Sequence, residues 1–545
     1  MKLLTVAEMI EQEHAAIAKG MSVSMLMNRA GLGLAEVIRQ RVKILGLQKV
    51  EVVALVGNGN NGGDALIALM ELARQGWAAK VIYLADRGGV DNLCAQVLAM
   101  GIPVIAANEM ENGSELAKFL SGANLVLDGV LGTGFKGEMR HELARRLSAI
   151  TKAFSWMPTR PYVVAVDCPS GANCDTGEVA PETLHADLTV CMAACKQGLL
   201  RQPAFGLCGE IASVGIGIEV SDGASGRLEV VEATDVRNIL PLRQWDAHKG
   251  KSGNVIICGG SAEYVGAPVL AGMGAYAVGS GLVRLAVPAF IQQAFASKLP
   301  EAIWLLMPAD DGSMEETGAA LLRQTVENAN VLVFGPGMGR QYSAQRLAHQ
   351  YFGNLVAQIP TIRPIGFGLG NTTNKMNQPS SFAHPPVVID ADGIRNLSGM
   401  EGWWKALPAG SVLTPHPGEM AGLTGMATAD VQADRVGIAS RFAKKWGCSV
   451  ILKGAQSVIG GPDGRIALIP ISAPALAKAG SGDVLAGIVA GLMAQGLVGY
   501  DAAWCGAWLH AMAGVDMANQ QGNEKTPTAS DIVQSLKRVF EKINR

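Results

Sequence analysis

Short apolar runs alternate with longer amphipathic stretches along the first part of the chain. Lys49–Val56 predicts a strand, which a glycine-rich loop separates from a helix over about residues 65–75. Lys80–Ala85 predicts the next strand, and Leu125–Asp128 and Tyr162–Asp167 predict two more, each of which ends in an aspartate. Strands that alternate with helices form a mostly parallel, doubly wound sheet. Because ligands bind beyond the carboxyl ends of such strands, polar residues at those ends are candidates for a functional site.

The same pattern starts again after a small, polar segment. Residues 219–226 are the predicted linker between a first α/β domain at 1–218 and a second at 227–545. In the second domain each apolar run is followed by glycine, proline, aspartate or histidine. These runs are Gly253–Gly260, Val331–Gly339, Pro386–Gly393, Ser411–Glu419 and Ser449–Gly454. Residues 360–385 lack this periodicity and are rich in proline, glycine, asparagine, threonine and serine, so we expect a mobile loop insertion there.

Composition and charge narrow the class of protein. A chain of 545 residues suggests two to four domains of about 100–200 residues each. A net charge of −2 gives no positive field for non-specific nucleic-acid binding. Acidic residues interrupt residues 1–20, where a signal peptide needs an apolar core, and the apolar stretches Val269–Val283 and Val484–Tyr500 are short and contain glycine. We therefore expect a cytoplasmic homo-oligomer that binds neither nucleic acid nor a membrane.

Cysteine and glycine counts add two further expectations. Nine cysteines are too few for a disulfide scaffold, and Cys191 and Cys195 lack the other ligands of a metal site, so we expect buried thiols. Glycine is unusually frequent, with 67 residues in 545, against a typical share of about 7%. The glycines cluster between apolar runs, where the backbone can approach a ligand closely.

The first glycine cluster, Gly57–Asp64, lies between a predicted strand and a predicted helix. It has the G-x-G-x-x-G spacing of a dinucleotide-binding fingerprint, and Asp86 ends the next strand, so an NAD-dependent dehydrogenase is one interpretation. The carboxylate of Asp64 would, however, repel a pyrophosphate, and Asn60 and Asn61 favour a hydroxyl-bearing or cation-linked ligand. A glycine turn with an aspartate cap is the structural alternative.

Two further strand ends complete a constellation of polar residues. Asp128 begins DGVLGTGFKGE, whose glycines expose backbone N–H groups that suit phosphate oxygens. Asp167 begins DCPSG and is a candidate general acid or base. Asn61, Asp128 and Ser170 supply hard oxygen ligands of the kind that an alkali cation accepts.

These motifs, in this order, resemble those of the NAD(P)H-hydrate epimerases over roughly residues 1–218. The family interconverts the R and S forms of hydrated NADH and NADPH, so the resemblance implies that activity on a Rossmann-like fold. It also implies K⁺ held by Asn61, Asp128 and Ser170, with Asp167 beside the reacting carbon. The implied substrate-binding residues are Asn60, Asn61, Gly62, Gly63, Asp64, Gly132, Thr133, Gly134, Phe135, Lys136, Gly137, Glu138 and Asp167. Cys168 departs from the isoleucine of the family's DIPSG pattern.

The strongest local motif of the second domain is AGSGD, which ends at Asp483 and opens the apolar helix Leu485–Met493. Backbone N–H groups at such a helix start form an anion site. Asp483 is positioned to accept a proton from a substrate hydroxyl as phosphate arrives. An N-cap aspartate on a core helix is the structural alternative, which the polar loops at Gly335–Gly339, Pro415–Glu419 and Lys453–Ala455 disfavour.

The ordered set HKG, GGS, GAP, GPGMG, DAD, TPHPGE, KG and AGSGD resembles the ribokinase-like, ADP-dependent NAD(P)H-hydrate dehydratases over about residues 226–545. The implied hydrate contacts are Ala267, Gly337, His416 and Asp483, and the implied nucleotide contacts are Lys453, Gly454, Ala455, Gln456, Ser457 and Gly482. The resemblance further implies Mg²⁺, and ADP as co-substrate: Asp483 deprotonates the hydroxyl, the terminal phosphoryl group transfers to it, and phosphate then leaves. Asp390–Ile394 reads DADGI in place of the family's DADAL and keeps both acids.

Together the two resemblances imply a bifunctional enzyme that epimerises hydrated NAD(P)H and dehydrates its S form, leaving AMP and phosphate. Three other interpretations remain: a ribokinase-like small-molecule kinase with an accessory domain, a nucleotide-binding scaffold, and the dehydrogenase. TPHPGE disfavours the kinase, and intact Asn61, Asp128 and Asp167 disfavour the scaffold. The dehydrogenase lacks an identifiable site for a second hydride-transfer partner.

Overall fold

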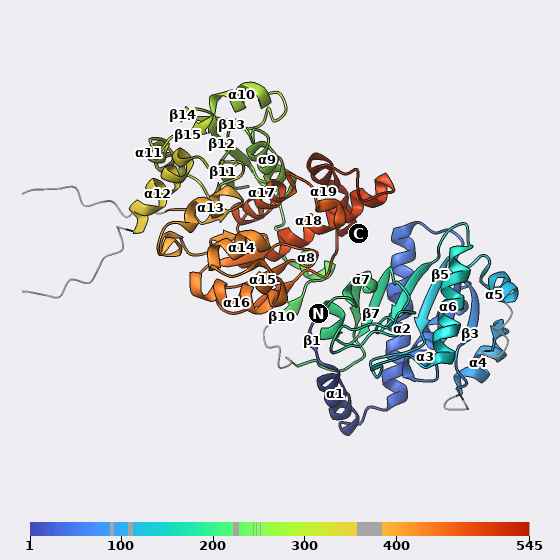
Figure 1. Ribbon diagram of the computed structural model, residues 1–545. Helices are drawn as coiled ribbons and strands as arrows, with labels where there is room; N and C mark the ends of the chain where they lie inside the picture. The colour runs from blue at the N-terminus through green and yellow to red at the C-terminus, as the bar shows by residue number, and fades with distance from the viewer. Residues whose placement is uncertain are drawn as a thin grey trace, which may run out of the picture. The chain divides into compact units, whose positions relative to one another are not determined.

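The chain forms two compact units, Met1–Glu232 and Ala233–Arg545 (Figure 1). The computed structural model describes residues 1–87, 92–106, 113–221, 228–243, 245–246, 248–250, 252–356 and 384–543. Most of the predicted linker at 219–226 and of the predicted insertion at 360–385 lies outside the described residues. The domain bounds at 218 and 227 therefore stay predictions.

The first unit alternates strands with helices, as the hydrophobic pattern predicts. Its strands are β1 (Leu3–Leu4), β2 (Glu51–Val56), β3 (Ala78–Tyr83), β4 (Val104–Ile105), β5 (Leu125–Gly129), β6 (Tyr162–Val166), β7 (Leu188–Met192), β8 (Cys195–Lys196), β9 (Glu210–Val214) and β10 (Leu228–Val230). Its helices are α1 (Val6–Ala18), α2 (Val23–Leu45), α3 (Asn60–Arg74), α4 (Leu93–Ala99), α5 (Gly113–Leu120), α6 (His141–Ser155), the 3₁₀ turn η2 (Gln197–Leu200) and α7 (Phe205–Cys208).

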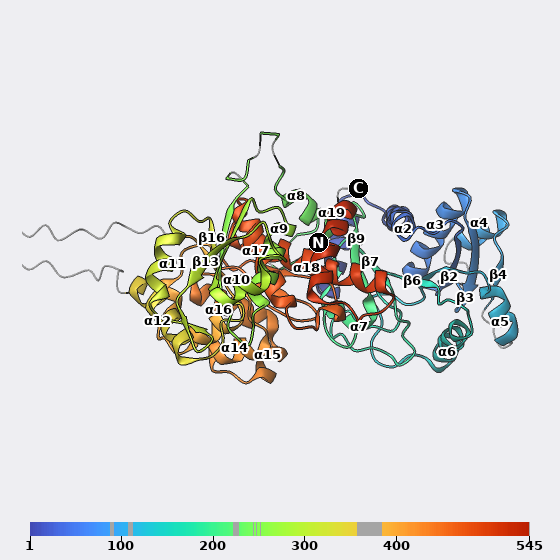
Figure 2. The ribbon, with the colours of Figure 1, turned by 90° about the horizontal axis from the view of Figure 1, so that it is seen from above.

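The main sheet of this unit has the order β4-β3-β2-β5-β6-β7-β9, and its paired strands run parallel. Alternate residues of β2 face opposite sides: Val52 packs with α2 and α3, while Val53 packs with α5 and α6. Figure 2 shows α2 and α3 on one side of the sheet and α6 on the other. The chain order reverses between β2 and β5, which makes the ends of these two strands the switch point of a doubly wound sheet.

The second unit is also α/β. Its strands are β11 (Asn254–Cys258), β12 (Leu282–Pro288), β13 (Ile303–Met307), β14 (Ala309–Asp310), β15 (Ser313–Met314), β16 (Val331–Phe334), β17 (Val387–Ile389), β18 (Val412–Leu413), β19 (Ser449–Leu452), β20 (Val458–Gly460) and β21 (Ile466–Leu468). Its helices are α8 (Ala233–Ile239), α9 (Ala267–Ala277), α10 (Ala289–Phe295), α11 (Gly318–Val326), α12 (Tyr342–Val356), α13 (Asp392–Ser398), η3 (Trp403–Ala406), α14 (Pro417–Thr424), α15 (Thr428–Ala433), α16 (Arg435–Trp446), η4 (Pro474–Leu476), α17 (Ser481–Ala494), α18 (Gly499–Gln521) and α19 (Ala529–Ile543).

The sheet of the second unit runs β21-β20-β19-β18-β17-β16-β11-β12-β13. The strands from β19 to β13 are parallel, whereas β20 and β21 pair antiparallel at one edge. The chain order reverses between β11 and β16. The carboxyl ends of β16, β17, β18 and β19 therefore lie along one edge, and each is followed by a motif that the sequence singled out.

Helices α9 and α17 pack unusually closely, and glycine makes this possible. A Cβ atom on Gly487 would stand 1.9 Å from the carbonyl oxygen of Ala271, and one on Gly274 would stand 2.5 Å from that of Val484. Real Cβ atoms do not approach a backbone so closely, so any side chain at these positions would push the helices apart. Because α9 begins at Ala267 and α17 carries Asp483, the same contact fixes two predicted site residues relative to each other.

Three sequence expectations can be compared with the described residues. The helix predicted from about residue 65 instead begins at Asn60, because its backbone continues into the NNGGD motif after Gly59. Cys191 and Cys195 are buried as expected, and all nine cysteines are free thiols, of which only Cys94 is partly exposed. Within the described ranges, every helix is too short or too polar to cross a bilayer. Cytoplasmic location, the homo-oligomer and the lack of nucleic-acid binding stay predictions.

Candidate functional sites

The first candidate site lies at the switch point between β2 and β5. A Cβ atom on Gly57 would stand 1.9 Å from the carbonyl oxygen of Val130, so only glycine lets the two strand ends meet. Arg87, which is 3% exposed, donates to the carbonyl oxygens of Gly57 at 2.8 Å and Gly59 at 3.0 Å. The sequence reasoning missed Arg87, because a lone arginine after a strand has no distinctive pattern.

Asn61, Asp128 and Ser170, predicted as cation ligands, lie together and are buried. Ser170 donates to Asp128 twice, from Oγ at 2.5 Å and from its backbone N–H at 2.9 Å. The amide nitrogen of Asn61 donates to the carbonyl oxygen of Leu131 at 2.9 Å, and Leu131 N–H donates to Ser170 Oγ at 2.8 Å. Burial raises the pKa of Asp128. Asn61 Oδ1 is buried and has no hydrogen-bond donor, which leaves an oxygen that a cation would satisfy.

The predicted substrate loop starts against this cluster. A Cβ atom on Gly132 would stand 3.3 Å from Asn61 Cβ, so the loop leaves β5 in contact with the first turn of α3. Phe135 N–H donates to the carbonyl oxygen of Gly132 at 3.2 Å and closes a turn. Gly134 and residues 136–138 are exposed, while Thr133 and Phe135 are half-buried. The loop thus presents backbone to solvent beside the buried cluster, and Gly62, Gly63 and Asp64 lie in the adjoining helical turn.

Asp167 follows β6 with φ 63°, a left-handed conformation that non-glycine residues rarely adopt. Its Oδ1 forms an ion pair with Lys196 Nζ and accepts the backbone N–H of Met192 at 2.8 Å. Burial, reinforced by the negative charges of Asp167 and Glu13, raises the pKa of Asp64 well above its usual range. Asp167, Lys196, Asp64 and Glu13, which come from four separate parts of the first unit, therefore interact at the first candidate site. The sequence reasoning missed Lys196 and Glu13; a lysine that ends the apolar, cysteine-containing run 188–196 is the signal that could have indicated the first.

The second candidate site lies at the ends of β17, β18 and β19. Asp390 is 1% exposed, and its Oδ1 accepts a hydrogen bond from Thr414 Oγ1 at 2.5 Å and pairs with Lys453 Nζ at 2.8 Å. Glu419 Oε2 lies 4.0 Å from the same ammonium. Burial would lower the pKa of Lys453, but the charges of Asp390 and Glu419 outweigh it and raise that pKa. Lys453 thus stays cationic among carboxylates. The sequence motifs predicted Lys453 as a nucleotide contact but did not predict its ion pairs with Asp390 and Glu419.

Asp483 and Gly482 join this cluster from the start of α17. A Cβ atom on Gly482 would stand 3.3 Å from Lys453 Nζ and 3.8 Å from Asp390 Oδ2. Burial, followed by the charge of Asp390, raises the pKa of Asp483 to about 7, and Lys453 opposes the shift. Burial also raises the pKa of Glu419 to about 7. A carboxyl group that titrates near neutral pH is suited to general acid–base catalysis.

His416 caps the first turn of α14. Its Nδ1 accepts the backbone N–H groups of Gly418 at 3.0 Å and Glu419 at 3.2 Å. Burial and the positive charge of Lys453 lower the pKa of His416, so the ring is neutral at physiological pH. With Nδ1 acting as acceptor, the ring proton sits on Nε2, which lies 3.3 Å from Glu419 Oε1.

The glycine loop after β16 and the start of α9 also meet at this edge. Gly337 has φ 62°, and a Cβ atom there would stand 2.7 Å from Ala267 Cβ, so these two predicted hydrate contacts are neighbours. Gly339 N–H donates to Asp392 Oδ2 at 3.0 Å. A Cβ atom on Gly335 would stand 2.2 Å from the carbonyl oxygen of Asp390. The loop is therefore connected to the carboxylate cluster through the DAD motif.

Arg435 holds the predicted nucleotide loop, residues 453–457, through hydrogen bonds to backbone carbonyl groups. This side chain donates to the carbonyl oxygens of Leu452 at 2.9 Å and Gln456 at 2.8 Å. Ser457 Oγ donates to the carbonyl oxygen of Gly454 at 3.4 Å, while Gly454 and Ala455 are exposed. The loop therefore offers backbone groups to solvent next to Lys453 and Gly482. The sequence reasoning also missed Arg435, whose pKa is lowered by burial.

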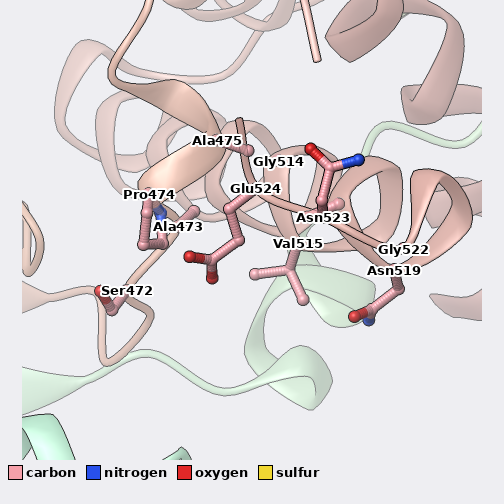
Figure 3. Close-up of a pocket in the computed structure, with 11 residues that line it drawn as sticks. Ser472, Ala473, Pro474, Ala475, Gly514, Val515, Asn519, Gly522, Asn523 and Glu524 are labelled. Atoms are coloured by element: carbon pink, nitrogen blue, oxygen red, sulfur yellow. The ribbon is translucent and has the colours of Figure 1, made fainter. Parts of the chain in front are cut away.

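One buried histidine and two hollows complete the description of this unit. His510 of α18 is 6% exposed, its Nε2 has no hydrogen-bond partner, and burial lowers its pKa to about 4. A hollow of about 350 Å³ is lined by residues 472–475 and by parts of 514–524, including Val515, Asn519 and Glu524 (Figure 3). It contains none of the predicted site residues. A smaller hollow of about 250 Å³ is lined in part by Gly418 and Glu419, next to the carboxylate cluster.

Two family models match the chain. The one described as NAD(P)H-hydrate dehydratase matches residues 255–538, and the one described as YjeF-related protein N-terminus matches residues 23–198. Among solved structures, a ribokinase-like superfamily protein from Enterococcus faecalis has 21% identity and a TM-score of 0.47, covering 59% of this chain and 99% of its own.

Full-length relatives carry both parts in one chain. The bifunctional NAD(P)H-hydrate repair enzyme of Moorella thermoacetica is 33% identical over 99% of this chain and 97% of its own. That of Salinibacter ruber is 34% identical over 94% of this chain and 91% of its own. With both family models matched in order and relatives aligned along nearly the whole length, this chain belongs to the family of bifunctional NAD(P)H-hydrate repair enzymes.

Proposed function

We propose that the first unit interconverts R- and S-NAD(P)HX, and that the second dehydrates S-NAD(P)HX to NAD(P)H with ADP, releasing AMP and phosphate. The observation that carries the proposal is that each unit of this family member places a buried carboxylate cluster at the carboxyl ends of its strands. One cluster includes Asp167 with Lys196, and the other includes Asp483 with Lys453. Two chemically distinct sites in one chain match two successive reactions on one metabolite.

Epimerisation requires the C–O bond at the hydrated ring carbon to break and re-form on the opposite face. Residues 60–64 and 132–138 would bind the hydrate, and Asp167 would lie beside the reacting carbon. As the hydroxyl leaves as water, with a proton that Asp167 relays from solvent, positive charge develops on the ring, which the resulting carboxylate stabilises. Water then adds to the other face and gives its proton to that carboxylate, which returns it to solvent and ends ionised as it began.

The buried acceptors of the first unit fit an alkali cation. We propose that Asn61 Oδ1, Asp128 and Ser170 hold K⁺, since Asn61 Oδ1 has no donor and burial raises the pKa of Asp128. When bound, K⁺ would supply positive charge that favours the ionised form of Asp128 and orients the substrate. Replacing K⁺ by Li⁺ should weaken epimerisation and leave dehydration unchanged, and equal epimerisation in both salts would contradict the proposed site.

Dehydration is proposed to proceed by phosphorylation and elimination. Asp483 removes the proton of the hydrate hydroxyl while that oxygen attacks the terminal phosphorus of ADP, and AMP leaves. The ring nitrogen lone pair then expels phosphate, a better leaving group than hydroxide, and loss of a proton from the neighbouring ring carbon C5 to water restores the dihydronicotinamide. His416, whose Nε2 lies 3.3 Å from Glu419 Oε1, would contact the hydrate, with Ala267 and Gly337 lining its position. Lys453 would compensate the charge of the transferred group.

We propose that the nucleotide binds to Lys453, Gly454, Ala455, Gln456, Ser457 and Gly482. Mg²⁺ usually keeps several waters and binds through one or two carboxylates plus phosphate oxygens. Among the described residues, no cluster of three or more His, Cys, Asp or Glu side chains is arranged as a metal site. We propose that Mg²⁺ would enter with the nucleotide phosphates, near Asp390 and Glu419, and would neutralise phosphate charge.

The decisive experiment is incubation of an R,S-NADHX mixture with the protein, ADP and Mg²⁺. Recovery of the full NADH absorbance requires both activities, because the dehydratase consumes only the S form. Recovery of the S fraction alone would refute the epimerase role of the first unit. A stable phosphorylated product without NADH would instead support the kinase interpretation.

A further inference from the structure

Lys196 is almost completely buried, with 1% of its side chain exposed. Its ammonium forms an ion pair with Asp167 Oδ1 and donates to the carbonyl oxygen of Met192 at 3.2 Å. Met192 N–H donates to the same Oδ1 at 2.8 Å. One carboxylate oxygen of Asp167 is therefore committed to the protein, which leaves Oδ2 for a substrate.

The backbone fixes both partners. Asp167 has φ 63° and its N–H donates to the carbonyl oxygen of Val190 at 2.8 Å, which aims the side chain toward β8. Lys196 stands opposite Leu4 in the parallel pair of β8 with β1, and Cys195 N–H donates to the carbonyl oxygen of Lys2 at 3.0 Å. A strained backbone on one side and a paired strand on the other hold the ion pair in one geometry.

Charged and ionisable groups surround this pair. The groups that interact electrostatically with it or with its carboxylate neighbours are Glu13 and His14 of α1, Asp64 of α3, Arg87, Cys168, Cys174 and Cys191. Burial raises the pKa of both Glu13 and Asp64, and the charge of Asp167 raises them further. Among the charged groups named here, Lys196 is the cation in direct contact with Asp167.

We propose that Lys196 is the positioning residue of the epimerase site: with the backbone N–H of Met192 it commits Asp167 Oδ1, so that Oδ2 faces the hydrate. This inference rests on the proposed function of the first unit, in which Asp167 acts on the reacting carbon. Lys196 itself does not touch the substrate in this arrangement.

Lys196→Met tests the proposal by removing the charge while keeping much of the side-chain volume. We expect kcat for epimerisation to fall about tenfold or more with little change in KM, because Asp167 loses the contact that orients it. Lys196→Arg keeps the cation and should restore part of the rate. Lys80→Met is the matched control, because Lys80 pairs with Glu51 in the same unit and should leave epimerisation unchanged.

A double-mutant cycle separates this inference from the proposed function. If Lys196 acts through Asp167, Asp167→Asn and the double variant should be equally impaired, and the double variant should be more stable than Lys196→Met because it leaves no unpaired buried charge. A normal kcat in Lys196→Met, or additive losses in the double variant, would overturn the inference. Normal epimerisation in Asp167→Asn would refute the proposed function first.

Discussion

At the scale of single residues, the ionised carboxyl group of Asp483 destabilises the folded protein but supplies the proposed catalytic base. Burial and the charge of Asp390 raise its pKa to about 7, so the folded protein favours the protonated form. The stabilisation that protonation gives is present below the unfolded pKa and is lost as pH rises toward 7. Above that pH an ionised, desolvated base is ready to accept a proton from substrate.

Asp483→Asn should therefore abolish dehydration, leave epimerisation intact and stabilise the second unit by about 1 kcal/mol at pH 8. The gain would appear as a rise of about 2–4 °C in its melting temperature. Asp531→Asn is the matched control, since Asp531 also lies in a first helical turn but hydrogen bonds from Thr528 lower its pKa. The control should lose a little stability and keep full activity. Retained dehydration in Asp483→Asn would exclude it as the base.

The same group predicts the pH dependence of dehydration. Because a base must be ionised to accept a proton, kcat/KM should follow the ionisation of Asp483, whose pKa is raised to about 7. It should be constant above a pH of about 8, and below a pH of about 6 it should fall by about tenfold for each pH unit. Glu419 titrates in the same range and would steepen the fall if it must also be ionised. Initial rates with purified S-NADHX measure the profile, and a flat response from pH 5.5 to 8 would contradict this assignment.

At the scale of elements, the glycines of α9 and α17 let two helices come into backbone contact. The start of α9 carries Ala267 and the start of α17 carries Asp483, so this packing sets the distance between the proposed hydrate contact and the proposed base. The contact positions are Gly274, Gly487 and Gly491, whose Cβ atoms would each meet backbone of the facing helix.

Gly487→Ala should accordingly destabilise the second unit by about 1–3 kcal/mol, because the added methyl would stand 1.9 Å from a carbonyl oxygen. Gly422→Ala in α14 is a helical control with nothing within 4 Å of the new methyl. It should be neutral or stabilising, since alanine favours helix by about 1 kcal/mol over glycine. Thermal unfolding compares the two, and equal stability of both variants would show that the helices can separate without cost.

At the scale of the whole molecule, each of the two compact units holds its own cluster of carboxylates and a lysine. No residue of the first cluster belongs to the unit that contains the second. The product of one reaction is the substrate of the other, so the activities are linked by a diffusible metabolite and need not share residues.

A mixture of two full-length variants, each lacking one of the two activities, should therefore restore the full reaction. Asp167→Asn alone should convert only the S fraction of R,S-NADHX, and Asp483→Asn alone should yield no NADH. Equimolar mixing should recover complete conversion, followed by absorbance, because each variant supplies the activity that the other lacks. Failure of the mixture, with both variants folded, would mean that each active site depends on the other within one molecule.

Much of this organisation could be predicted from the sequence, for identifiable reasons. Strand-end motifs singled out Asp167, Asn61 and Asp483 because several glycine- and aspartate-containing motifs follow apolar runs in one order, which an isolated turn or helix cap would not explain. Lys196 and Arg435 could not be found in this way. Each contacts a segment distant in sequence, and a single lysine or arginine gives no periodic signal. The early start of α3 was missed because NNGGD has low helix propensity, which tertiary contacts override.

The thiols give this chain a practical property. Burial raises the pKa of Cys208, Cys258, Cys448 and Cys505, so these groups stay protonated and react slowly with oxidants and alkylating agents. Cys94 is the partly exposed member of the set and lies in α4 of the first unit. A maleimide fluorophore would consequently attach there first, giving a site-selective optical reporter on one unit of an enzyme that contains nine cysteines.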